Sequence, residues 1–136
     1  MLFVSSDEVS CVVFDPQNPN ILASSSWDET VKIWDITSGS CLSTLRGHSD
    51  RVTSVAFNKE GTLLASSSYD KTVKIWDPVS GEEKCTLMGD LPIWSVAFSA
   101  GGHCIAAGCG DESEGEILIF KLQESGDWEM QSERRA

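Results

Sequence analysis

The chain has 136 residues, of which 40% are hydrophobic and 23% charged, and its formal net charge is −11 because 21 acidic residues outnumber 10 basic ones. This composition is that of a globular chain long enough for one domain, and it excludes an intrinsically disordered protein. The acidic balance disfavours nucleic-acid binding, because the net field would repel a phosphate backbone.

The first third of the chain alternates short apolar, β-branched segments with segments of turn-forming residues. Val9, Val12 and Phe14 are apolar in the first of these segments, and DPQNPN at 15–20 is a run of turn formers. Glycine follows the third segment, at Gly39, where a turn needs a positive φ. Four strands in succession are therefore predicted, at residues 9–14, 21–26, 30–35 and 41–45.

The same succession of segments returns further along the chain. ILASSSWDETVKIWD at 21–35 is almost repeated by LLASSSYDKTVKIWD at 63–77, so that Trp34 and Trp76 lie 42 residues apart. The first strand has counterparts at 51–58 and 92–99. A fixed period of this size predicts three structural repeats rather than one irregular domain.

These repeats resemble the WD40 family. The matching residues are Gly47-His48 at a repeat start, Asp28 and Asp70 before a strand, and Trp34-Asp35 and Trp76-Asp77 at its end. The resemblance implies an all-β fold of β-propeller blades, with about three four-stranded antiparallel sheets, too few to close a ring alone. We expect blades at about 8–46, 50–88 and 92–131, followed by a polar tail at 132–136.

Both outer repeats depart from the pattern. Ser5 stands where the second repeat has His48, so the chain is expected to begin inside a repeat, as a fragment or a shortened isoform would. In the third repeat nine residues rather than six separate Asp111 from the aromatic position, which is Phe120 instead of Trp. Strands are still expected at 117–120 and 127–130.

The resemblance also assigns a structural role to a set of polar residues. It implies a hydrogen-bonded tetrad of His48, Ser66, Asp70 and Trp76, with partial sets at Asp28 and Trp34 and at Asp111 and Phe120. A His, a Ser and an Asp in one repeat also fit a catalytic triad. We reject that alternative because no GxSxG nucleophile motif is present, and we expect a protein that is not an enzyme.

The family's loops around the central channel imply a face for partner proteins or peptides. By position, this face would carry Ser10, Thr53 and Trp94 at the channel wall, Trp27 and Tyr69 at loop tips, and Arg51 beside them. Alternatively, Trp94 packs on a neighbouring blade, and Trp27 and Tyr69 merely cover blade edges. The rival function is a structural segment that works only when further blades or a second copy complete it.

Other classes of site have little support. Two histidines and five cysteines never reach the paired spacing of a zinc site, and the glycines form no phosphate loop, so no metal or cofactor is expected. An odd number of cysteines favours a reducing intracellular location, the cytoplasm more than the nucleus. The longest apolar runs are too short to cross a bilayer, so no membrane association is expected.

Overall fold

The computed structural model describes the backbone of residues 3–135 and the side chains of residues 3–131. Within this range every regular element is a β-strand, and the twelve strands form three four-stranded antiparallel sheets. Blade 1 contains β1 (Val9–Phe14), β2 (Ile21–Ser26), β3 (Thr30–Asp35) and β4 (Ser40–Arg46). Blade 2 contains β5 (Val52–Phe57), β6 (Leu64–Ser68), β7 (Thr72–Trp76) and β8 (Glu83–Met88). Blade 3 contains β9 (Ile93–Phe98), β10 (Cys104–Gly110), β11 (Gly115–Leu122) and β12 (Trp128–Arg135).

The predicted fold class is confirmed, including the two expected strands of the irregular third repeat. In each sheet the strands pair in chain order, and a bulge interrupts the pairing near the start of the first strand. The backbone of β12 continues to Arg135, so it includes residues for which the sequence predicted a polar tail.

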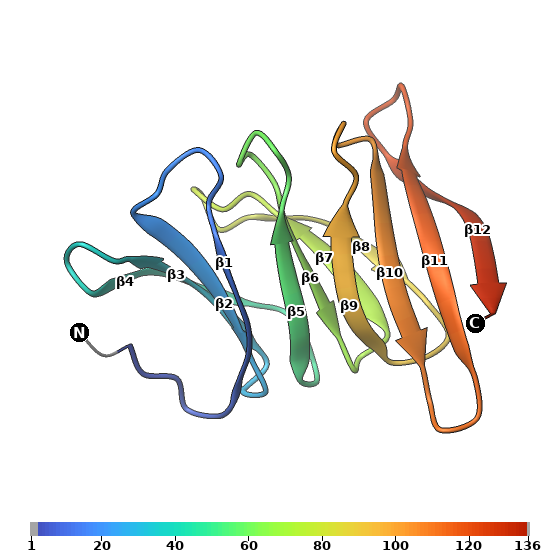
Figure 1. Ribbon diagram of the computed structural model, residues 1–136, viewed down its shortest axis with the longest axis horizontal. Coiled ribbons are helices and arrows are strands. Elements are labelled where there is room, and N and C mark those ends of the chain that lie inside the picture. The colour runs from blue at the N-terminus through green and yellow to red at the C-terminus, as the bar shows by residue number, and fades with distance from the viewer. Residues whose placement is uncertain (1–2, 136) are drawn as a thin grey trace.

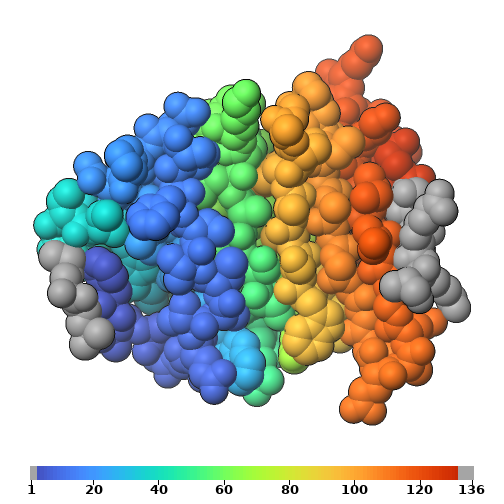
Figure 2. Space-filling view, in the orientation of Figure 1, coloured from blue at the N-terminus to red at the C-terminus, as the bar shows by residue number. Residues whose placement is uncertain are grey.

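The blades stand side by side, with β1 next to β5 and β5 next to β9 (Figure 1). In the space-filling view the three blades follow one another as blue, green and orange bands without a gap (Figure 2). Apolar side chains between neighbouring blades form two cores, one around Val52 and Val55 and the other around Ile93 and Ile105. Burying a side chain of this kind contributes about 1.5 to 3 kcal/mol, so the blade interfaces hold the fold together.

The middle blade is covered on both faces and the outer blades on one. Every residue of β7 is buried, whereas residues of β11 alternate between buried and accessible. Val9 and Val12 of β1 are 51% and 54% exposed, although their counterparts Val52 and Val55 are 0% and 2% exposed. Blades 2 and 3 each pack this face against the preceding blade, whereas in blade 1 the face is exposed.

Because the described residues contain strands and loops, no helix among them is long and apolar enough to span a membrane.

Candidate interaction surface

A chain of hydrogen bonds crosses the middle blade and joins the four residues of the predicted tetrad. The indole Nε1 of Trp76 donates to Ser66 Oγ at 2.8 Å. Ser66 Oγ lies 2.6 Å from His48 Nε2, and His48 Nδ1 lies 2.8 Å from Asp70 Oδ2. An indole only donates and a carboxylate only accepts, so Ser66 Oγ accepts from Trp76 and His48 Nδ1 donates to Asp70. Each polar group of this buried chain thus has a partner.

The Asp70 carboxylate closes the chain and also organises the turn before β7. Burial alone would raise the pKa of this carboxyl, but hydrogen bonds from His48 and Thr72 and the nearby imidazole outweigh it and hold the pKa well below its ordinary range. Asp70 Oδ1 accepts from the backbone N–H of Thr72 at 2.9 Å. Lys71, between them, has a φ of 73°, a left-handed conformation that this hydrogen bonding holds in place.

Blade 1 carries the two ends of the same chain without its centre. Trp34 Nε1 donates to Ser24 Oγ at 2.9 Å, as in the middle blade. At the other end Ser5, which takes the place of His48, donates to Ser26 Oγ at 2.9 Å and to Asp28 Oδ2 at 3.3 Å. Among the described residues no side-chain hydrogen bond joins these two ends.

Blade 3 replaces the chain by apolar packing. From the strand pairing within each blade, Ala107 occupies the position equivalent to Ser66 of blade 2, and Phe120 the position equivalent to Trp76. Ala107 and Phe120 are 0% and 2% exposed. Asp111 instead accepts from the backbone N–H and the hydroxyl of Ser113, both at 2.8 Å, and so closes its own loop.

The geometry does not favour catalysis by the tetrad. Ser66 Oγ is fully buried and already accepts from Trp76, so no substrate could reach it as a nucleophile. In the described part of the chain no group of three His, Cys, Asp or Glu side chains could hold a metal ion. The tetrad therefore pairs polar groups that are buried inside the blade.

Four of the predicted partner-binding residues form one row across the three blades. The guanidinium of Arg51 lies 4.1 Å from the ring centre of Trp27 and 5.7 Å from that of Tyr69. Tyr69 in turn meets Trp94 edge to face, with ring centres 4.6 Å apart. We call Trp27, Arg51, Tyr69 and Trp94 the stacked row. It joins blade 1 to blade 3 on one side of the molecule through cation–π and aromatic contacts.

Backbone hydrogen bonds fix the loop tips of this row. The N–H of Trp27 donates to the carbonyl of Glu8 at 2.9 Å, and the N–H of Tyr69 donates to the carbonyl of Arg51 at 3.0 Å. Trp94 Nε1 donates to the carbonyl of Gly110 at 3.0 Å, yet the residue remains 51% exposed. The rings are thus held in position by contacts within the chain.

Ser10 and Thr53, also predicted on this face, connect neighbouring blades. Ser10 Oγ donates to the carbonyl of Val52 at 2.7 Å, and Thr53 Oγ1 donates to the carbonyl of Ile93 at 2.7 Å. Their hydroxyls are therefore engaged between blades, a role that sequence reasoning missed. Trp94 stands at the equivalent position of blade 3. A shallow hollow of about 280 Å³ opens here, lined by Glu8, Val9, Ser10, Trp27, Thr53 and Trp94.

Comparison with known proteins supports the repeat architecture. The family model of the WD domain, G-beta repeat (WD40) matches residues 2–35, 39–77 and 81–113. The F-box-like/WD repeat-containing protein TBL1X of Mus musculus is 47% identical over 109 residues, which cover 78% of this chain and 20% of that protein. Nuclear distribution protein PAC1 of Fusarium vanettenii is 56% identical over 41 residues, 30% of this chain and 9% of that protein.

A solved structure shares the same fold. The crystal structure of the β-propeller domain of Myceliophteria thermophila Cps50 (Swd1) matches 98% of this chain and 40% of that one, with a TM-score of 0.76 and 25% sequence identity. The chain spans at most about a fifth of the length of the curated relatives described above. The three matched repeats, in three blades that do not close a ring, show that the chain belongs to the WD40 repeat family.

Proposed function

We propose that this chain is a non-enzymatic protein-interaction module that presents the stacked row to a partner peptide or domain. WD40 propellers generally serve as scaffolds for protein interactions, and the comparisons place this chain in that family. The observation that carries the proposal is the continuous contact of Trp27, Arg51, Tyr69 and Trp94 across all three blades.

Several properties of the row fit partner binding. Tryptophan, tyrosine and arginine are the side chains that most often dominate the energy of protein interfaces. The contacts within the row already order its side chains, so these side chains would lose little conformational entropy when a partner binds. Trp94 also exceeds what the fold needs, since its counterparts are the small residues Ser10 and Thr53.

A peptide array tests this proposal. Wild-type chain, Trp94→Ala, Trp27→Ala and the control Leu42→Ala are labelled and applied to the same array of synthetic peptides. Leu42 is 56% exposed on β4, away from the stacked row, so its removal controls for loss of an exposed apolar side chain. We expect peptides bound by wild type to lose most of their signal with Trp94→Ala and Trp27→Ala but to keep it with Leu42→Ala. Equal signals for all four proteins, or no bound peptide, would contradict the proposal.

The exposed face of blade 1 favours a second candidate function, that of a segment completed by another blade. Val9, Val12 and Phe14 are 51%, 54% and 59% exposed, and at the opposite end Ile117 of blade 3 is 47% exposed. Their counterparts in the middle blade lie within blade interfaces, so a blade of the same kind would cover them. A second copy could offer both complementary faces at once, in a head-to-tail arrangement.

Light scattering after size exclusion separates the two functions. A monomer that still binds peptides supports the interaction module. A dimer that dissociates in Val12→Asp and in Ile117→Asp supports completion by a second copy. Wild-type protein that is monomeric at all concentrations would contradict self-completion.

A further inference from the structure

The segment at residues 3–6 passes over the outer face of blade 1, at the end of the row of blades (Figure 1). We call this segment the strap. The ring of Phe3 packs on the ring of Trp34, with ring centres 5.1 Å apart and planes inclined at 44°. Phe3 also lines, together with Val9 and Val12, a hollow of about 200 Å³ on this face. One aromatic side chain of the strap therefore lies on the face that is otherwise open in blade 1.

Trp34 is buried even though the face around it is open. It is 7% exposed, whereas Val9 and Val12 on the same face are about half exposed. Its counterpart in blade 2, Trp76, is 1% exposed and belongs to a buried cluster that includes side chains of blade 1. The strap thus helps to cover the Trp34 end of the open face, where blade 2 has a preceding blade.

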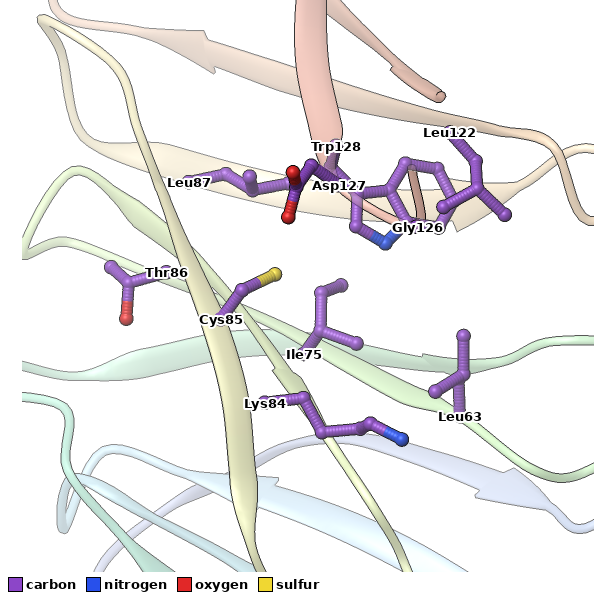
Figure 3. Close-up of a pocket in the computed structure, with 10 residues that line it drawn as sticks. All are labelled: Leu63, Ile75, Lys84, Cys85, Thr86, Leu87, Leu122, Gly126, Asp127 and Trp128. Carbon is purple, nitrogen blue, oxygen red and sulfur yellow. The ribbon is translucent and has the colours of Figure 1, made fainter. Parts of the chain in front are cut away.

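The hollow on blade 1 differs from the space between two blades. Between blades 2 and 3, side chains of both blades line a cleft of about 590 Å³, with Ile75 on one side and Trp128 on the other (Figure 3). The hollow on blade 1 has one blade in its wall, and its remaining lining residue is Phe3. The strap therefore takes part of the place that a second blade has between blades 2 and 3.

Hydrogen bonds hold the strap on the blade but do not lock it there. Ser5 Oγ donates to Ser26 Oγ at 2.9 Å, and Ser6 Oγ donates to Asp28 Oδ2 at 2.9 Å. Ser26 Oγ also accepts from the backbone N–H of Asp28, and Asp28 Oδ1 accepts from the backbone N–H and the hydroxyl of Thr30. If the strap lifts, both acceptors keep a partner, so its displacement leaves neither of them unpaired.

We propose that the strap is a displaceable cover that competes with a second copy of the chain for the open face of blade 1. The equivalent face of blade 2 is occupied by blade 1, whose Ile33 and Leu45 belong to the same buried cluster as Trp76. A blade docked on blade 1 in the same way would meet Trp34 where Phe3 now packs, so the strap has to give way. This inference rests on the second candidate function, completion by another copy, and adds that the chain itself restrains that completion.

Sedimentation velocity of the whole chain over a series of concentrations tests the competition. Wild type is compared with Phe3→Ala and with the control Val4→Ala, which trims a strap side chain that is 69% exposed. The apparent affinity between copies scales with the fraction of chains whose face is uncovered, so Phe3→Ala should associate at least about twofold more tightly than wild type. Val4→Ala should match wild type. Adding Val12→Asp to Phe3→Ala should abolish the association, because it places a charge on the open face.

A second readout reports on the cover in dilute, monomeric samples. The indole NMR signal of Trp34, assigned with Trp34→Phe, should shift in Phe3→Ala because the neighbouring ring is gone, while the signal of Trp76 should stay in place. An unmoved Trp34 signal would overturn the proposal. Unchanged or weaker association of Phe3→Ala, in a wild type whose association is lost with Val12→Asp, would overturn the proposal and leave completion by a second copy intact. Monomers at all concentrations for both wild type and Phe3→Ala would refute that completion and the competition with it.

Discussion

Replacing Ser66 by alanine removes the one atom on which two buried side chains of the middle blade depend. Ser66 Oγ accepts from Trp76 Nε1 at 2.8 Å and lies 2.6 Å from His48 Nε2. Ser66 is 0% exposed and Trp76 is 1% exposed, so water cannot take the place of the hydroxyl. The variant leaves an indole N–H and an imidazole nitrogen without a partner.

The structure supplies an internal comparison for the size of this effect. An unpaired buried group costs about 1 to 3 kcal/mol, so two such groups should make Ser66→Ala destabilising by about 2 to 6 kcal/mol. In blade 1, Ser24→Ala leaves only Trp34 Nε1 without a hydrogen-bond partner. Trp34 lines a hollow of about 200 Å³ on the exposed face. We expect Ser24→Ala to cost about 1 kcal/mol, because water can approach the indole there.

Urea denaturation followed by far-ultraviolet circular dichroism measures both changes. The free energies of unfolding of wild type, Ser66→Ala and Ser24→Ala are compared at one protein concentration, with the denaturant slope checked for constancy. An equal loss of unfolding free energy in the two variants, or a smaller loss for Ser66→Ala, would refute the reasoning. The reasoning is that the number of buried groups left without a partner sets the loss of stability.

Three other changes test separate parts of the structure. The pKa of Asp70 lies below its ordinary value of 3.8 in the folded chain, so its stabilising effect is present above about pH 4 and is lost as the pH falls further. The free energy of unfolding of wild type should therefore fall below about pH 4 more steeply than that of Asp70→Asn, and parallel curves in urea titrations would contradict this. Thr53→Val removes the hydroxyl that bonds to Ile93 of the next blade and should cost about 0.5 to 1.5 kcal/mol in the same assay, while Thr53→Ser should retain most of the stability. Ala107→Ser restores the serine of the repeat pattern without its indole partner, and a melting temperature above that of wild type would show that the apolar packing of blade 3 is misunderstood.

The repeat pattern was sufficient to predict the three sheets and most of their strands. Each blade is built from local hairpins, so turn residues and alternating apolar residues specify it within about 40 residues of sequence. The insertion after Asp111 did not disturb this, since the loop it lengthens lies between β10 and β11. The tail was less predictable, because β12 gains its length from pairing with β11 rather than from any pattern of its own.

The candidate surface was predictable only in part. Family position indicated the exposed aromatic residues, but the stacking of Arg51 between Trp27 and Tyr69 depends on loops of different blades and left no local signal. The bonds of Ser10 and Thr53 to the next blade were missed for the same reason.

Amide hydrogen exchange, followed by mass spectrometry on dilute samples, tests the central claim that three blades pack in a row with only the middle one covered on both faces. We predict the slowest exchange in β6 and β7, and exchange at least about tenfold faster in β1 and β11, whose outer faces are open. Protection of β1 or β11 equal to that of β7 would contradict this arrangement.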